Sequence, residues 1–148
     1  MLRPPNSCTR RYLDNRLVEI VNDDHLPSNP KYALFDFDGT LSLIREGWMG
    51  IMIPMMVDIL VSTGTNETQT EITQVVTEFV EELTGRQTIY QMIRLTDEIS
   101  IRGGIVKTPL EYKNEFLILL DKHIHSRRQG LKTGSLNPSK FLVPGSLS

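Results

Sequence analysis

The chain has 148 residues, of which 39% are hydrophobic and 23% are charged, and its formal net charge is -2. This balance is typical of a soluble globular protein, and it argues against a basic surface for nucleic acid. The single cysteine, Cys8, excludes an internal disulfide and a cysteine-ligated metal cluster. The single thiol favours a cytoplasmic protein, and the charge balance predicts no nucleic-acid partner. The longest apolar run is too short to span a membrane, so we expect no membrane partner. The composition favours no particular oligomeric state.

Residues 1–30 are predicted to be a leader with a short helix over Tyr12–Val21, followed by a turn-rich connector. The run Tyr32–Phe37, YALFDF, then predicts a strand, because it is short, mostly apolar and bounded by Pro30 and Gly39. The run lacks polar alternation, which indicates a strand covered on both faces, as in a parallel sheet.

The next part of the chain is helical in character. Apolar residues recur there at i, i+3 and i+4 spacing, Pro54 is expected to kink or divide the first helix, and Thr108-Pro109 is a helix start signal. Phe141–Val143 could begin another strand or simply pack down before Pro144-Gly145. The predicted helices cover residues 43–62, 67–84, 89–102 and 110–128.

One strand cannot form a sheet by itself. We therefore expect the fold class to be α/β, with an incomplete Rossmann-like parallel sheet core and an inserted α-helical cap. The partial core would comprise residues 31–42 and 131–148, and the cap residues 43–130. The other strands would then lie beyond Ser148, so that this chain is an N-terminal fragment. The alternative is an all-α body with one odd strand.

The segment LFDFDGTL, residues 34–41, is the best candidate for chemistry. Asp36 and Asp38 would lie at the carboxyl end of the predicted strand, where α/β sheets bind their ligands. Two adjacent carboxylates repel each other unless a cation is present, and a hard divalent ion such as Mg²⁺ resolves this. Gly39 permits a sharp turn, and Thr40 offers a hydroxyl and an amide to an anion. The alternative is that both aspartates simply end the strand and cap the next element.

The run Ala33–Leu41 resembles the first motif of the haloacid dehalogenase-like hydrolase superfamily, a hydrophobic strand followed by D-x-D-G-T-L. The helical stretch after it resembles that family's α-helical cap, and Phe141–Gly145 is similar to the run that leads back into the core. The resemblance in organisation covers residues 32–145, but only the motif is specific in sequence.

The resemblance implies a Mg²⁺-dependent phosphatase that acts on a small phosphorylated metabolite, for example a sugar phosphate, through an aspartyl phosphate. Asp36 would be the nucleophile and Asp38 the general acid and base, and both would ligate Mg²⁺. Gly39 and Thr40 would bind the phosphoryl group. A phosphomutase of the same family is one alternative, and a non-catalytic helical interaction module is another.

The family pattern also needs a Ser or Thr, a Lys and later acidic residues, and we assign none of them in this sequence. We therefore expect this chain alone to have little or no phosphatase activity. The loop between two cap helices is a candidate for substrate specificity, in which Arg86 would meet a second anionic group and Gln87 a sugar hydroxyl. Helix capping by Gly85 and Thr88 is the alternative, and Trp48 is expected to pack in the interior.

Overall fold

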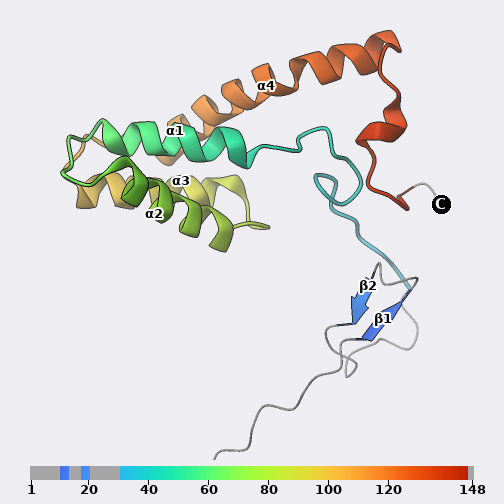
Figure 1. The fold of residues 1–148 in the computed structure, drawn as a ribbon, viewed down its shortest axis with the longest axis horizontal. Helices are drawn as coiled ribbons and strands as arrows, with labels where there is room; N and C mark the ends of the chain where they lie inside the picture. The colour runs from blue at the N-terminus through green and yellow to red at the C-terminus, as the bar shows by residue number, and fades with distance from the viewer. Residues whose placement is uncertain (1–10, 14–17, 21–30, 147–148) are drawn as a thin grey trace, which may run out of the picture. The chain divides into compact units, whose positions relative to one another are not determined.

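The computed structural model describes residues 11–13, 18–20 and 31–146 (Figure 1). The chain divides into two compact units, residues 1–34 and 35–148. In the first unit, β1 (Arg11–Leu13) pairs with β2 (Val18–Ile20) in antiparallel register. The helix predicted over Tyr12–Val21 is therefore wrong at the described positions, while residues 14–17 and 21 lie outside them. Aromatic and β-branched residues suit a strand pair better than a helix.

Within its described residues the second unit contains four α-helices and one 3₁₀ helix. α2 and α3 lie close to their predicted bounds, whereas α1 begins at Met49 and not at residue 43, and α4 continues to Thr133 and not to residue 128. α1 runs through Pro54 without being divided. Of the described helices, none is long and apolar enough to cross a membrane. The helices are α1 (Met49–Val61), α2 (Gln69–Glu82), α3 (Thr88–Ile101), α4 (Pro109–Thr133) and η1 (Pro138–Phe141).

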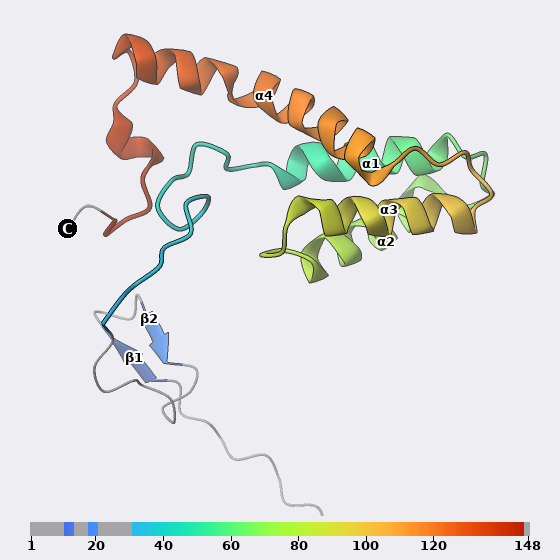
Figure 2. The ribbon, with the colours of Figure 1, turned by 180° about the vertical axis from the view of Figure 1, so that it is seen from behind.

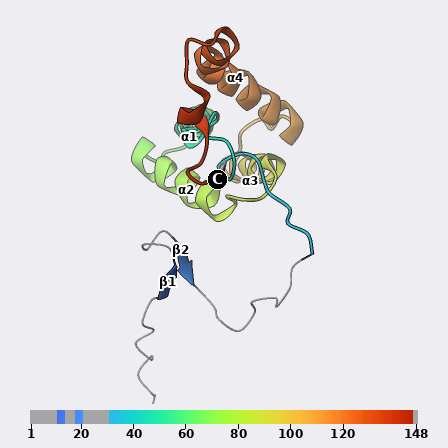
Figure 3. The same cartoon turned by 90° about the vertical axis from the view of Figure 1, so that its right-hand side faces the viewer.

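α1 and α3 each contact the other three α-helices. The end-on view in Figure 3 shows α1 between α4 on one side and α2 and α3 on the other. The first half of α4 packs against α1 and α3, and its second half projects beyond them (Figure 2). The projecting half leads to η1 and the C-terminal segment.

Two helices begin with a capping box, in which a threonine and a glutamate three residues later cap each other's backbone amides. Thr68 and Glu71 form this arrangement at α2, and Thr108 and Glu111 form it at α4. Pro109 follows Thr108 at the first helical position, as predicted. Local sequence therefore defines both starts.

The hydrophobic core lies among the four helices. Each fully buried side chain of leucine or isoleucine size contributes about 1.5–3 kcal/mol relative to leaving it in water. Both Met52 and Met56 are fully buried, so methionines of α1 help to fill the core. The core also includes Leu60, Ile72, Val76, Phe79, Val80, Met92, Leu95, Ile99, Tyr112, Phe116, Leu120 and Ile124.

A charged cluster joins the end of α3 to the loop before α2. The Arg102 guanidinium donates to both carboxylate oxygens of Glu67, at 2.5 and 2.7 Å, and it also pairs with Glu98. Arg94 pairs with the same Glu98 from the preceding turn of α3. Arg102 and Glu98 are both buried. Hydrogen bonds from Arg102 hold the pKa of Glu67 below its usual value, and Glu67 in turn raises the pKa of Arg102.

The predicted α/β fold is wrong. Residues 32–37 form no strand, and the described part of the chain is mainly helical and contains no parallel sheet. Tyr32, Leu34, Phe35 and Phe37 are all exposed, and Leu34 is 100% exposed. A strand needs a neighbour for its backbone hydrogen bonds, and the described residues place none beside this run. Residues 31–42 and 131–146 therefore do not form the partial sheet core that the sequence suggests.

Candidate functional site

The motif is folded into a tight loop by its own backbone. The Phe37 carbonyl accepts hydrogen bonds from the amides of Leu41 and Ser42, at 3.0 and 2.9 Å. The Gly39 amide donates to the Ser42 carbonyl at 2.8 Å. Gly39 has φ 78°, in the left-handed region that glycine adopts without strain, which confirms the predicted sharp turn. The chain therefore doubles back directly after Asp38.

The C-terminal segment holds the other end of this loop. The Leu43 amide donates to the Phe141 carbonyl at 2.8 Å, and the Val143 amide donates to the Leu41 carbonyl at 3.1 Å. Together they form a short antiparallel bridge between Ser42 and Leu142. The strand predicted at Phe141–Val143 is thus present only as this bridge.

α4 fixes the linker that follows the motif. The Arg127 guanidinium donates to the carbonyl of Ile44 at 3.0 Å and to that of Glu46 at 2.8 Å. His123, one turn earlier on α4, lies against Gly47. The backbone on both sides of Arg45 is therefore anchored to one helix.

Arg45 forms an ion pair with the second aspartate of the motif. Its Nη1 lies 2.8 Å from Oδ2 of Asp38, and the side chains are 49% and 43% exposed. The sequence alone does not predict this contact. The available signal is that Arg45 is the first cationic residue after the motif.

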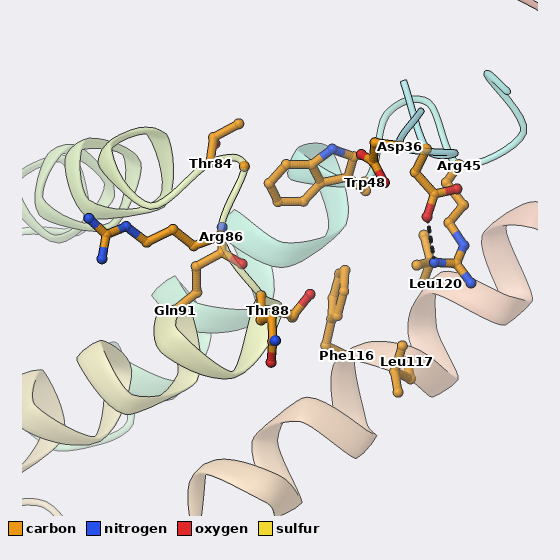
Figure 4. A pocket seen from close by; sticks show the side chains of 13 residues that line it. Asp36, Arg45, Trp48, Thr84, Arg86, Thr88, Gln91, Phe116, Leu117 and Leu120 are labelled. Carbon is orange, nitrogen blue, oxygen red and sulfur yellow. Dashed lines mark hydrogen bonds and ion pairs between the residues drawn. The ribbon is translucent and has the colours of Figure 1, made fainter. Parts of the chain in front are cut away.

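The motif faces the loop between α2 and α3 across a cavity of about 490 Å³ (Figure 4). Asp36 and Asp38 line one side, and residues 84–88 line the other. The rings of Trp48 and Phe116 lie between the two sides. Trp48 both packs against the core, as predicted, and lines the cavity. The remaining lining residues are Arg45, Gln91, Leu117 and Leu120.

The predicted specificity loop contributes Arg86 and Gln87 to this lining. Figure 4 shows the Arg86 side chain directed away from Asp36, so it does not reach the carboxylates in this conformation. Gly85 has φ 86°, which suits its predicted role after α2. Thr88 is not the N-cap of α3, because Gln87 occupies that position without a side-chain capping bond. The side-chain amide of Gln87 therefore takes no part in capping α3.

Four of the six predicted site residues line this cavity, namely Asp36, Asp38, Arg86 and Gln87. Gly39 lines a smaller neighbouring cavity together with Asp38 and Arg45. Thr40 is exposed in the turn and lines neither cavity. The structure therefore brings the two aspartates and the predicted specificity loop to one cavity, but Thr40 does not line it.

The donor set suits a magnesium ion that keeps much of its water. Mg²⁺ is commonly held by one or two carboxylates, with water and phosphate oxygens as the remaining ligands. Asp36 offers a carboxylate beside the cavity, and the Asp38 carbonyl accepts no hydrogen bond from any described residue. The described residues contain no cluster of three or more potential ligand side chains. The fit is therefore to a hydrated ion and not to a closed protein cage.

No family model, curated protein or solved structure matches this chain. The resemblance to the haloacid dehalogenase-like hydrolases thus rests on the motif residues 33–41 and on the position of the helices after them. The activity that this resemblance implies is accordingly a proposal.

Proposed function

We propose that this chain carries the nucleophile segment of a Mg²⁺-dependent phosphate monoester hydrolase that acts on a small phosphorylated metabolite. The observation that carries the proposal is the shared cavity, in which Asp36 and Asp38 lie opposite the loop that contains Arg86 and Gln87. Its volume of about 490 Å³ falls in the range of small-molecule sites, which is roughly 300–1,000 Å³. A cavity of this size accommodates a sugar phosphate.

The first chemical step forms a covalent intermediate. A carboxylate oxygen of Asp36 attacks phosphorus, the phosphorus–oxygen ester bond breaks, and the departing alkoxide takes a proton from Asp38. Asp38 then removes a proton from water, whose oxygen attacks the aspartyl phosphate. Inorganic phosphate leaves, and the Asp36 carboxylate is restored.

Charge must be balanced for this reaction, because a phosphate dianion approaches two carboxylates. A bound Mg²⁺ would supply positive charge to the phosphoryl oxygens, held by the Asp36 carboxylate and the Asp38 carbonyl. Trp48 and Phe116 would exclude water from the far side of the substrate. Gln87 would contact a hydroxyl group of the leaving alcohol.

The test is capture of a phosphoryl group on Asp36. The purified 148-residue chain is incubated with Mg²⁺ and acetyl phosphate, whose leaving group needs no acid, and its intact mass is followed over time. We expect wild type to gain one phosphoryl group and to lose it slowly, in keeping with the little turnover expected of this chain alone, and Asp38→Asn to retain the group longer, because the base that activates water is lost. Asp36→Asn is expected to gain none.

Asp97→Asn is the matched control, because it removes an exposed aspartate on α3 that does not line the cavity. It should behave as wild type, and chelation of Mg²⁺ should abolish labelling of every variant. Absence of a phosphorylated form in both wild type and Asp38→Asn contradicts the proposal and favours a non-catalytic helical module. Transfer of the captured group to a second sugar phosphate, instead of to water, identifies a phosphomutase.

A further inference from the structure

Arg45 is the cationic side chain that lies closest to the chemistry of the cavity. Two cationic residues line the cavity within the described chain, Arg45 and Arg86. The Arg86 side chain is directed away from the aspartates (Figure 4), whereas Arg45 reaches the Asp38 carboxylate at 2.8 Å. Arg45 is therefore the cationic group of the cavity lining that lies beside the aspartates.

The position of Arg45 is defined by its backbone and not by its side chain. The carbonyl groups before and after it are held by Arg127, and its own carbonyl accepts the Trp48 amide at 3.2 Å. The side chain itself is 49% exposed and borders three cavities, all of which Asp38 also lines. Because the backbone of Arg45 is held in place and its side chain is half-exposed, the guanidinium can change partners without refolding of the chain.

The contact with Asp38 leaves most of the guanidinium available. The guanidinium has five N–H donors, and the structure gives it one hydrogen bond, from Nη1. An ion pair as exposed as this one contributes little to stability, so its exchange for another anion is easy. A phosphate group offers a guanidinium two parallel hydrogen bonds and a larger negative charge than a carboxylate.

We propose that Arg45 is a phosphate-binding residue that exchanges partners. It pairs with Asp38 in the free protein and moves to the phosphoryl oxygens when the substrate binds. The exchange neutralises part of the phosphate charge and leaves the Asp38 carboxyl group free to approach the leaving oxygen. The identity of the anion as a substrate phosphoryl group rests on the proposed function, but the partner exchange itself is a binding property.

The test is a double-mutant cycle on binding of inorganic phosphate in the presence of Mg²⁺, measured by isothermal titration calorimetry. The proteins are wild type, Arg45→Ala, Asp38→Ala and the double variant. Loss of a charge-assisted bidentate contact should weaken binding about tenfold or more in Arg45→Ala. Asp38→Ala should bind more tightly than wild type, because the competing partner of Arg45 is gone. The double variant should bind as weakly as Arg45→Ala.

Partner exchange and simple repulsion differ in whether the effect of Asp38→Ala on phosphate affinity requires Arg45. If Asp38→Ala improves binding equally with and without Arg45, Asp38 acts only by repelling the anion, and the partner exchange is wrong. Unchanged affinity in Arg45→Ala likewise overturns it. Arg45→Lys keeps the charge without the planar fork and should bind with intermediate affinity.

Lys107→Ala is the matched control, because Lys107 is also half-exposed and paired with a carboxylate, Glu115, but lines a different cavity. It should leave the affinity for phosphate unchanged. Thermal unfolding of each variant verifies that the helical body is intact. Arg45-dependent binding without phosphorylation of Asp36 would support the exchange while contradicting the proposed hydrolase, so the two failures are distinguishable.

Discussion

At the scale of single residues, Gly104 shows how closely the unit is packed. A Cβ atom at this position would lie 2.7 Å from Cγ2 of Thr63 and 2.8 Å from Cγ2 of Ile99. Both neighbours are β-branched, and their χ1 angles are stiff. Ile99 is buried and belongs to the hydrophobic core. The absence of a side chain at Gly104 therefore permits the contact between the α1–α2 loop and the end of α3.

We expect Gly104→Ala to lower the free energy of unfolding by about 1–3 kcal/mol, because the added methyl group overpacks this contact. Urea denaturation followed by circular dichroism measures the change. Gly50→Ala is the control, since Gly50 lies in α1 with open space around its Cα. It should raise the free energy of unfolding by up to about 1 kcal/mol through reduced backbone entropy. Equal effects at both positions would contradict the packing argument.

Side-chain contacts between distant residues are the part of the site that sequence reasoning misses. The sequence predicts that Asp36, Asp38, Arg86 and Gln87 belong to one site, and all four line one cavity. The contacts of Arg45 with Asp38 and of Arg127 with Ile44 were not predicted. These contacts form because residues far apart in the sequence lie close together in space, with α4 beside residues 44–46. A local sequence pattern does not contain that information.

At the scale of elements, the cluster around Arg102 fixes α3 relative to the loop before α2. Glu98 is buried, and two arginines neutralise it. Removal of one partner of a buried ion pair leaves an uncompensated charge, which is far more costly than loss of an exposed pair. These ion pairs need particular partners, so they fix which end of α3 lies beside the loop before α2. Apolar contacts are not directional and do not fix this position by themselves.

We expect Arg102→Met to lower the free energy of unfolding clearly, because Glu67 loses its partner and the buried Glu98 keeps only Arg94. Lys107→Met removes a half-exposed pair with Glu115 and should change the free energy of unfolding much less than Arg102→Met does, because solvent screens that pair. Both values come from urea denaturation at neutral pH. A small effect of Arg102→Met would show that solvent screens the cluster.

The same cluster predicts a dependence on pH. Arg102 holds the pKa of Glu67 below its usual 4.5 in the folded protein, so the stabilisation is fully present above that value. It is lost as the pH falls through the lowered pKa. The difference in stability between wild type and Arg102→Met should therefore shrink in acid below about pH 4.5. The capping carboxylates Glu71 and Glu111 have lowered pKa values in both proteins, so they cancel in this comparison.

The helices were predictable because their signals are local, and the sheet was not. The apolar spacing and the capping residues Thr68 and Thr108 lie within a few positions of the elements that they define. A strand depends on neighbours that can be far away in the sequence. The run Tyr32–Phe37 has the composition of a buried strand, but it lies extended and exposed without one. Composition alone did not reveal whether a partner would be present.

At the scale of the whole molecule, exposed apolar residues in succession should drive association. Leu34 and Phe35 are both exposed, and they belong to a run with high strand propensity. We expect the chain to self-associate with rising concentration, and Leu34→Lys with Phe35→Lys to suppress this without changing the thermal midpoint of the helices. Static light scattering and circular dichroism provide the two measurements.

Ile105→Lys is the control for this experiment, because Ile105 is 96% exposed but is not part of that run. It should leave the scattering of the chain unchanged. A wild-type chain that scatters as a monomer at every concentration would falsify the role of residues 34 and 35. If Ile105→Lys suppresses self-association to the same degree, the added positive charge is the cause and not the loss of apolar residues from the run.

The bridge between residues 41–43 and 141–143 has a consequence for the helical body as a whole. The chain leaves for the helices and comes back at neighbouring points, with backbones about 5 Å apart as in adjacent strands. The two ends of the helical body therefore lie side by side and run in opposite directions. Such a body can be transplanted into a surface loop of another protein without stretching either end.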